Sequence, residues 1–189
     1  MIYGYNNTVG GDLNTITGSY NTAIGTQNDI YGNQNTLLGS INDVYGSNNL
    51  LLGNYNNLNG SYNLVQGSVN DVTGSGNYLL GNYNDVLGNL NYVNGSANCI
   101  EGSVNVVSGT YNTIDNGNYN VINGTQNVIN EGSYNGVLGS ANYVQGDANL
   151  LSGNLNDVIG TSNLIAGNCN DVYGDLNGVA GSGNYLVGS

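Results

Sequence analysis

The side chains of this sequence that could do chemistry are mainly carboxylates and amides. The chain has 12 Asp and Glu residues and no Lys, Arg or His, so its formal net charge is −12. Carboxylate oxygens are ligands that Ca²⁺ prefers, and a pair of carboxylates can hydrolyse glycosidic bonds. Six of the Asp residues form three pairs with members 14 residues apart, namely Asp29 and Asp43, Asp71 and Asp85, and Asp157 and Asp171.

The composition excludes several functions. Without His, Lys or Arg the chain has no ordinary general base, nucleophile partner or oxyanion clamp. The Asp pairs recur as a lattice instead of marking one pocket, so we predict a protein that is not an enzyme and has no catalytic or cofactor-binding residue. Nucleic acids are excluded as partners because neutralising their phosphates requires Lys or Arg. Membrane insertion is excluded because no apolar run reaches the length of a spanning helix.

A seven-residue repeat organises the whole chain. Gly recurs every seventh residue from Gly4 to Gly109, resumes at Gly117 and Gly124, and continues from Gly132 to Gly188, which defines 26 units. Counted from this Gly, position 4 is always Asn, and position 6 is Val, Ile or Leu in every unit except the one with Ala23. A coiled coil would need two apolar seams and good helix formers, which Gly and Asn are not.

The repeat instead fits a β-strand and a corner. Side chains at positions 4 and 6 should point inward and those at positions 3, 5 and 7 outward, while Gly and position 2 form the corner. Two units should close one coil, because all six paired Asp residues stand at position 5 of even-numbered units. We therefore predict an all-β fold, a parallel β-solenoid (β-roll) of about 13 coils, as one uncapped array over residues 1–189.

The regular spacing of the repeat also predicts what fills the solenoid. Stacked Val, Ile and Leu should form a thin core. Because an amide both donates and accepts, identical Asn side chains can hydrogen-bond along the stack. We predict such a structural ladder for the position-4 residues, including Asn28, Asn42, Asn56, Asn70 and Asn84.

Two units have eight residues, with the extra residues near Asn116 and Glu131. Both end even-numbered units of successive coils, so they should stack as a bulged corner. A bulge that preserves the register is one interpretation, and a cation site that gathers Glu101, Asp115 and Glu131 is the other. The stacked Asp pairs are further candidates for Ca²⁺, because like charges one strand apart repel unless a cation bridges them. No other cofactor is expected.

The repeat unit, written xxNxVxG, resembles that of the grass ice-recrystallisation-inhibition antifreeze proteins. Residues 26–32 (TQNDIYG) and 68–74 (SVNDVTG) are two examples, and the likeness extends over nearly the whole chain. The resemblance implies a left-handed β-roll with Val inside and Asn stacked, and it implies ice as a partner. In that family ice binding requires a flat face of regular small residues, and Thr8, Thr22 and Thr36 begin such a row.

The leading functional prediction is a structural protein that assembles end to end into an extracellular filament or surface fibre. The repeat shows no polar cap, and uncapped solenoid ends expose unpaired strand edges. A lateral contact between copies is predicted for an outward apolar column in the odd-numbered units, which contains Leu50, Leu64, Tyr78, Tyr92, Val106 and Val121. An ice-binding protein is the alternative function, and the stalk of a cell-surface adhesin is a second alternative.

Overall fold

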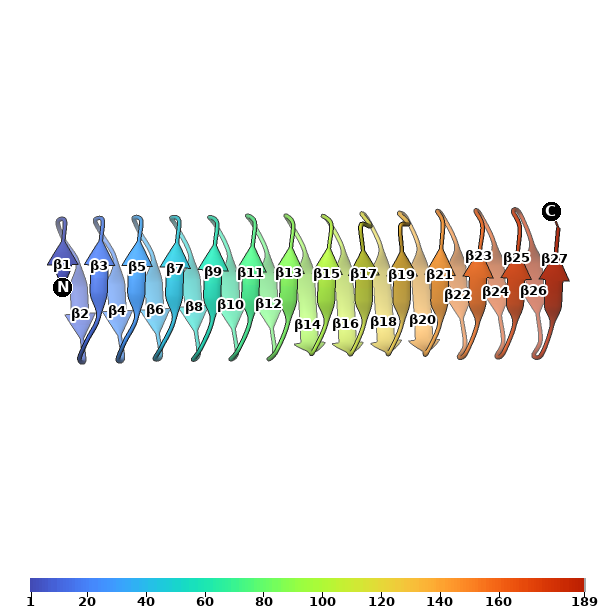
Figure 1. Cartoon of the computed structure of the whole chain (residues 1–189), viewed down its shortest axis with the longest axis horizontal. Helices are drawn as coiled ribbons and strands as arrows, with labels where there is room; N and C mark the ends of the chain where they lie inside the picture. Colours follow the sequence, from blue (N-terminus) through green and yellow to red (C-terminus); the bar gives the residue numbers. More distant parts are fainter. Residues whose placement is uncertain (189) are drawn as a thin grey trace. The chain divides into compact units, whose positions relative to one another are not determined.

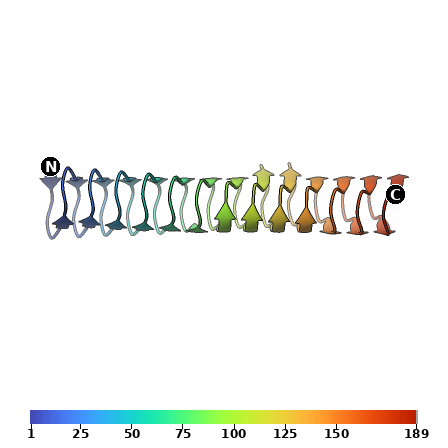
Figure 2. The ribbon, with the colours of Figure 1, turned by 90° about the horizontal axis from the view of Figure 1, so that it is seen from below.

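The computed structural model describes residues 1–188, and they form two compact units that divide between Tyr92 and Val93. Each unit is a parallel β-solenoid with about 14 residues per turn, and the chain makes about 13 turns in all. The predicted fold class is confirmed. Within each unit the odd-numbered strands form one parallel sheet and the even-numbered strands form a second, seen as two layers in Figures 1 and 2.

The strands are short and evenly spaced along the chain. Those of the first unit are β1 (Ile2–Tyr3), β2 (Thr8–Gly10), β3 (Thr15–Thr17), β4 (Thr22–Ile24), β5 (Asp29–Tyr31), β6 (Thr36–Leu38), β7 (Asp43–Tyr45), β8 (Leu50–Leu52), β9 (Asn57–Asn59), β10 (Leu64–Gln66), β11 (Asp71–Thr73), β12 (Tyr78–Leu80) and β13 (Asp85–Leu87). The next strand, β14 (Tyr92–Ser96), begins at the last residue of this unit.

The second unit continues the same pattern. Its strands are β15 (Cys99–Glu101), β16 (Val106–Thr110), β17 (Thr113–Asp115), β18 (Val121–Thr125), β19 (Val128–Asn130), β20 (Gly136–Ser140), β21 (Tyr143–Gln145), β22 (Leu150–Ser152), β23 (Asp157–Ile159), β24 (Leu164–Ala166), β25 (Asp171–Tyr173), β26 (Gly178–Ala180) and β27 (Tyr185–Val187). Residues 1–188 contain no helix that is long and apolar enough to cross a membrane.

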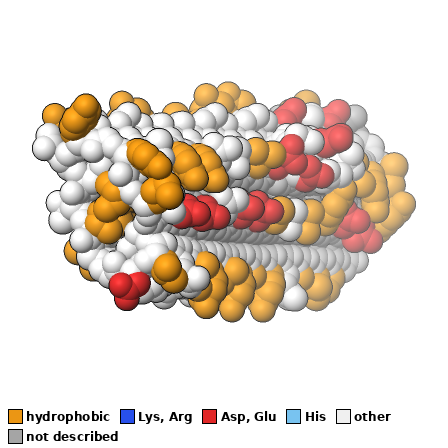
Figure 3. Space-filling view, turned by 60° about the vertical axis from the view of Figure 1, so that its left-hand side comes forward, with side chains coloured by type: hydrophobic (Ala, Val, Ile, Leu, Met, Phe, Trp, Pro, Cys, Tyr) orange, Lys and Arg blue, Asp and Glu red, His pale blue; other side chains and the backbone are white. Residues whose placement is uncertain are grey.

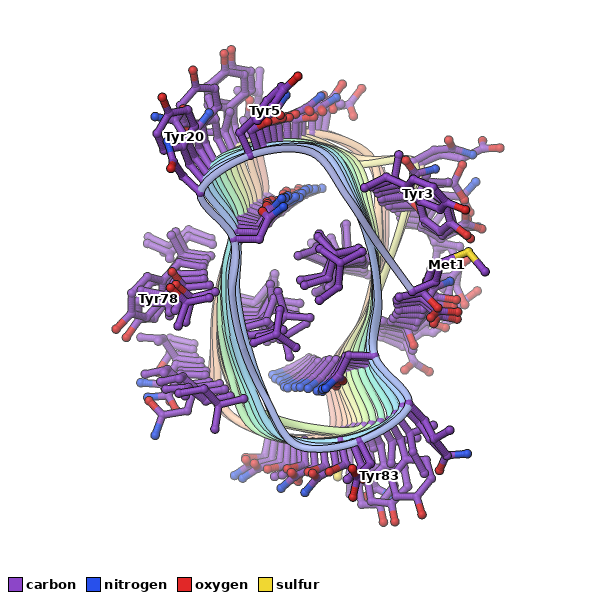
Figure 4. The ribbon with its side chains drawn as sticks, turned by 90° about the vertical axis from the view of Figure 1, so that its left-hand side faces the viewer. Met1, Tyr3, Tyr5, Tyr20, Tyr78 and Tyr83 are labelled. Atoms are coloured by element: carbon purple, nitrogen blue, oxygen red, sulfur yellow. The ribbon has the colours of Figure 1, made fainter. Side chains whose placement is uncertain are left out.

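The core is one aliphatic side chain per strand, as the repeat predicts. Leu58 in β9 and Val65 in β10, for example, are both fully buried. Consecutive coils keep an unshifted register, so that Val65 pairs with Leu51 on one side and with Leu79 on the other. The interior is therefore a double stack of aliphatic side chains flanked by two Asn columns, as the view along the coils shows (Figure 4).

Most buried Asn side chains use both of their amide protons, as Asn70 does. The Nδ2 of Asn70 donates to Oδ1 of Asn56 in the preceding coil at 3.0 Å and to the carbonyl oxygen of Gly81 in the following coil at 3.0 Å. Its own Oδ1 accepts from the backbone N–H of Asn84 at 3.0 Å. An unpaired buried polar group would cost about 1–3 kcal/mol. The ladder avoids this cost because it gives the buried amides hydrogen-bond partners inside the thin core.

The first Gly of the unit is required by the same packing. Gly67 has φ of 141°, and a Cβ there would collide with the carbonyl oxygen of Gly81 in the next coil. That carbonyl accepts an amide proton of Asn70, so the glycine and the asparagine of the repeat are both part of one hydrogen-bonded corner.

The corner is longer than the sequence predicted. Position 3 was expected to belong to the strand, but it has a left-handed backbone, with φ of 59° at Tyr55 and 61° at Val69. The strands accordingly cover mainly positions 5 to 7. This conformation is unfavourable for a side chain with a Cβ. It is retained because the position-3 N–H continues the ladder, as when Val69 donates to the carbonyl of Asn54 at 3.0 Å.

The two eight-residue units form successive bulged corners, as predicted. The extra residues take the left-handed conformation, with φ of 52° at Asn116 and 49° at Glu131. The following Gly117 and Gly132 then lie outside the left-handed region that the equivalent glycines adopt elsewhere. Because Glu131 N–H donates to the carbonyl of Asp115 at 2.8 Å, the ladder continues through the bulge.

Candidate functional site

The two sheets differ on their outer surfaces although their interiors are alike. The odd-numbered strands come from the even-numbered repeat units and carry eight of the 12 Asp and Glu residues, so we call their sheet the acidic sheet. Within residues 1–188 the even-numbered strands contain no Asp or Glu, and we call their sheet the uncharged sheet. Figure 3 shows carboxylates gathered in rows together with hydrophobic side chains.

On the acidic sheet the predicted Asp pairs are register partners. Asp29 pairs with Asp43, Asp71 with Asp85, and Asp157 with Asp171. The pKa of Asp43 is raised above its ordinary value. Burial of the carboxyl is the larger cause, and the charge of the partner carboxylate, Asp29, is the smaller one. The same two causes raise the pKa of Asp71 and of Asp157. Each pair therefore contains one carboxyl that resists ionisation.

Hydrogen bonds partly offset this effect in two of the pairs. The Nδ2 of Asn57 donates to Oδ1 of Asp71 at 3.2 Å, and the hydroxyl of Tyr173 donates to Oδ2 of Asp157 at 3.4 Å. The other carboxylate oxygen of Asp157, Oδ1, is buried and has no hydrogen-bond partner among the described residues. Asn57 shows how an amide beside an Asp converts repulsion into a hydrogen bond.

The described residues do not bring the carboxylates of the predicted acidic corner together as one group of metal ligands. No three His, Cys, Asp or Glu side chains within residues 1–188 come together as ligands for one ion. The expected gathering of Glu101, Asp115 and Glu131 is therefore wrong. The reason is the register, which pairs Asp115 with Asn130 and leaves Glu131 one residue further along, in the corner. Calcium binding by the Asp pairs stays a prediction.

The uncharged sheet of the first unit presents two outward columns. The first begins with Thr8, Thr22 and Thr36 in register and continues with Leu50, Leu64 and Tyr78. The second contains Gly10, Ile24, Leu38, Leu52, Gln66 and Leu80. Side chains of the first column point away from the core on the flat side of the coil, as Tyr78 does in Figure 4.

A shallow groove of about 430 Å³ follows the first column. Thr36, Leu50 and Leu64 line it on the sheet, and the corner residues Gln34, Asn48 and Tyr62 line it beside them, with Asn49 and Asn63. The groove is thus bordered by a hydroxyl, aliphatic groups and amides, without a charge. It is a surface for weak, repeated contacts, because no set of polar groups converges on one point.

In the second unit the uncharged sheet carries smaller side chains. Its first column runs through Val106, Val121, Gly136, Leu150, Leu164 and Gly178 in register. Its second column contains Ser108, Asn123, Leu138, Ser152, Ala166 and Ala180. The residues predicted to form a lateral contact between copies therefore face outward on this sheet in both units, and the contact itself stays a prediction.

The structure places the predicted ladder residues Asn28, Asn42, Asn56, Asn70 and Asn84 in one continuous column of hydrogen bonds. The stacked tyrosines, by contrast, were missed. Tyr31 and Tyr45 stack with ring centroids 5.0 Å apart, as do Tyr119 and Tyr134. The signal was present, because Tyr31 and Tyr45 stand one 14-residue period apart.

One family model matches the chain, in two segments that together cover residues 2–188. The segments are residues 2–102 and 99–188, and the family is described as the grass antifreeze β-roll. No curated protein matches the chain. This family and this fold are those of structural or ice-binding repeat proteins and are not those of a known enzyme family.

Proposed function

We propose, from the premise that the chain belongs to the grass antifreeze β-roll family, that it binds ice through its uncharged sheet. The family match favours this function over the filament that the sequence suggested first. End-to-end assembly has no support in the geometry of either unit and stays a prediction.

The absence of charge on one sheet carries the proposal. Ice is a rigid, periodic array of water, so a surface that binds it must be flat and repetitive and must release or reorganise its own hydration water. A carboxylate holds its water strongly and is costly to desolvate. The even-numbered strands carry no carboxylate although the chain has 12 acidic residues. The uncharged sheet is therefore the better surface for contact with ice.

The backbone supplies the flatness and the period. Parallel strands repeat about every 4.8 Å along the solenoid, and the register of the uncharged sheet is unshifted from Thr8 to Thr22 and from Thr22 to Thr36. Within the described chain the hydroxyls of Thr22 and Thr36 form no hydrogen bond with other residues, so they are available to surface water. The leucines of the next coils add apolar surface, and the removal of apolar surface from liquid water is favourable.

The ladder makes this surface rigid. Asn49 behind β8 donates to Oδ1 of Asn35 at 3.0 Å and to the carbonyl of Gly60 at 2.8 Å. Each coil is thereby fixed to its neighbours both by the sheet and by the amide column. A rigid surface loses little conformational entropy on binding, which suits a ligand that is itself a crystal.

Partition into growing ice tests the function directly. Protein in solution is frozen slowly from a seeded surface, and its concentration is compared between ice and remaining liquid, beside an acidic protein of similar size that does not bind ice. We expect this chain to be enriched in the ice and to slow the recrystallisation of a frozen film. Exclusion from the ice to the same degree as the control protein would contradict the proposal.

A further inference from the structure

Three pairs of tyrosines stack between neighbouring coils. Tyr31 in β5 and Tyr45 in β7 are register partners, with ring centroids 5.0 Å apart and planes inclined by 3°. Tyr119 and Tyr134 stand at successive corners, 5.0 Å apart with planes inclined by 1°. The third pair, Tyr78 and Tyr92 on the uncharged sheet, has centroids 5.2 Å apart and an inclination of 7°.

The stacked rings are open to solvent. The exposed fractions are 41% for Tyr31 and 47% for Tyr45, and they are 51% and 65% for Tyr119 and Tyr134. A soluble oxidant can therefore reach both phenols of a pair.

We propose that these pairs are sites of oxidative coupling, at which neighbouring coils become joined by dityrosine. The oxidant is hydrogen peroxide acting through a haem peroxidase. Each phenol loses one electron and one proton, and the two phenoxyl radicals form a carbon–carbon bond between their ortho positions. The ortho hydrogens then return to the oxygens as the rings become aromatic again. Two tyrosines lose two hydrogen atoms in total, and one peroxide is reduced to two waters.

The fold favours coupling within one molecule. A phenoxyl radical ordinarily has to meet its partner by diffusion, whereas here the second phenol stands one coil away, which is a large gain in effective concentration. Encounter between two copies is opposed by their net charge of −12 each. This inference does not depend on ice binding, and two of the three pairs lie away from the uncharged sheet.

The chain contains a matched control in Tyr55 and Tyr83. Both stand at corners, with exposed fractions of 60% and 66%, so an oxidant reaches them as easily as the stacked pairs. They are 28 residues apart, which is two coils, and Val69 occupies the corner between them. Their separation is therefore roughly 10 Å along the stack, too far for direct coupling.

The test is treatment of dilute protein with horseradish peroxidase and hydrogen peroxide. Coupled phenols are detected by their blue fluorescence in the monomer band of a denaturing gel. Cleavage before Asp residues cuts at Asp43 and separates Tyr31 from Tyr45, and cleavage after Glu131 separates Tyr119 from Tyr134. We expect mass spectrometry to find each of these fragment pairs joined, with a combined loss of two hydrogens.

Single substitutions assign the links. Tyr45→Phe should remove the link to Tyr31 and leave that between Tyr119 and Tyr134, Tyr134→Phe should do the reverse, and Tyr83→Phe should change neither. The proposal would be overturned by coupled product confined to dimers, by an equal loss of fluorescence in Tyr83→Phe, or by no coupled monomer while free tyrosine couples in the same mixture.

Discussion

The acidic and uncharged sheets are built by one repeat, but their outer surfaces differ, because within residues 1–188 only the acidic sheet carries carboxylates on its strands. Val72 in β11 and Val65 in β10 are both fully buried and have equivalent places in the core. Outside them, the acidic sheet pairs Asp71 with Asp85, whereas the uncharged sheet pairs Leu64 with Tyr78. The interior thus fixes one pattern for both sheets and leaves the outer positions free to differ.

This difference separates what the fold requires from what function requires. Glycine, asparagine and the aliphatic residue are needed throughout the stacked coils, because a Cβ would strike the next coil and a missing amide would leave carbonyls unpaired. The outward side chains at positions 5 and 7 are not subject to these structural requirements. A charge-free outer surface on one sheet of so acidic a chain is therefore the feature that points to a function.

Replacement of a ladder amide should have the largest effect and should not distinguish the sheets. Asn70→Asp, behind the acidic sheet, replaces the amide nitrogen that donates to Oδ1 of Asn56 and to the carbonyl of Gly81 with a carboxylate oxygen that can only accept. Burial of an unpaired carboxylate should cost on the order of 3 kcal/mol or more. Asn49→Asp, behind the uncharged sheet, breaks the equivalent bonds and should cost about as much. Urea unfolding followed by circular dichroism measures both, and a clearly milder loss in one variant would show that the interiors differ.

Truncation of the core should have the next largest effect, again alike in both sheets. Leu58→Ala in β9 and Leu51→Ala in β8 each remove a fully buried side chain from a single-residue layer. Each should reduce the free energy of unfolding by about 2–5 kcal/mol. The same urea titration applies, and an unchanged midpoint for either variant would contradict the packing described above.

Neutralisation of one Asp of a pair should have a smaller effect, confined to the acidic sheet. Because the pKa of Asp43 is raised in the folded chain, the folded state binds a proton more tightly than the unfolded state. Stability should therefore rise as the pH falls through this raised pKa, and level off below the ordinary value of 3.8. Asp43→Asn should raise the melting temperature at pH 7 and flatten its dependence on pH.

The control for this prediction is Asp12→Asn, which removes the same charge from a corner outside the Asp pairs. Melting temperatures of the two variants and the parent chain are compared between pH 7 and pH 4. A melting temperature of Asp43→Asn that equals or falls below that of the parent at pH 7 would mean that the pair does not repel in the folded chain.

The sequence predicted the solenoid because its signals are periodic. The 14-residue coil followed from the placement of Asp29 and Asp43 in alternate units, and the ladder from an Asn in every unit. The left-handed backbone at Tyr55 and Val69 was not predictable, because these side chains do not favour it and the ladder of neighbouring coils imposes it. The sequence located the inserted residue near Glu131, but it did not show that the register would pair Asp115 with Asn130 and leave Glu131 outside the column.

Function was the weakest prediction, again for a physical reason. The sequence shows that Leu50, Leu64 and Tyr78 face outward, and an apolar column suits a contact with a second copy as well as a contact with ice. The family match favours ice. The uncharged outer surface then indicates which sheet would take part.

The most direct test of this central claim places the same two charges on either sheet. One variant carries Leu50→Asp and Leu64→Asp, register partners on the uncharged sheet, and its control carries Asn59→Asp and Thr73→Asp, register partners on the acidic sheet, all at outward strand positions. Both add two negative charges, and circular dichroism first establishes that both are folded. Inhibition of ice recrystallisation is then measured against protein concentration. We expect the first variant to lose the activity and the second to keep it, and equal activity of the two, or loss in the second alone, would contradict the assignment of the uncharged sheet as the ice-binding surface.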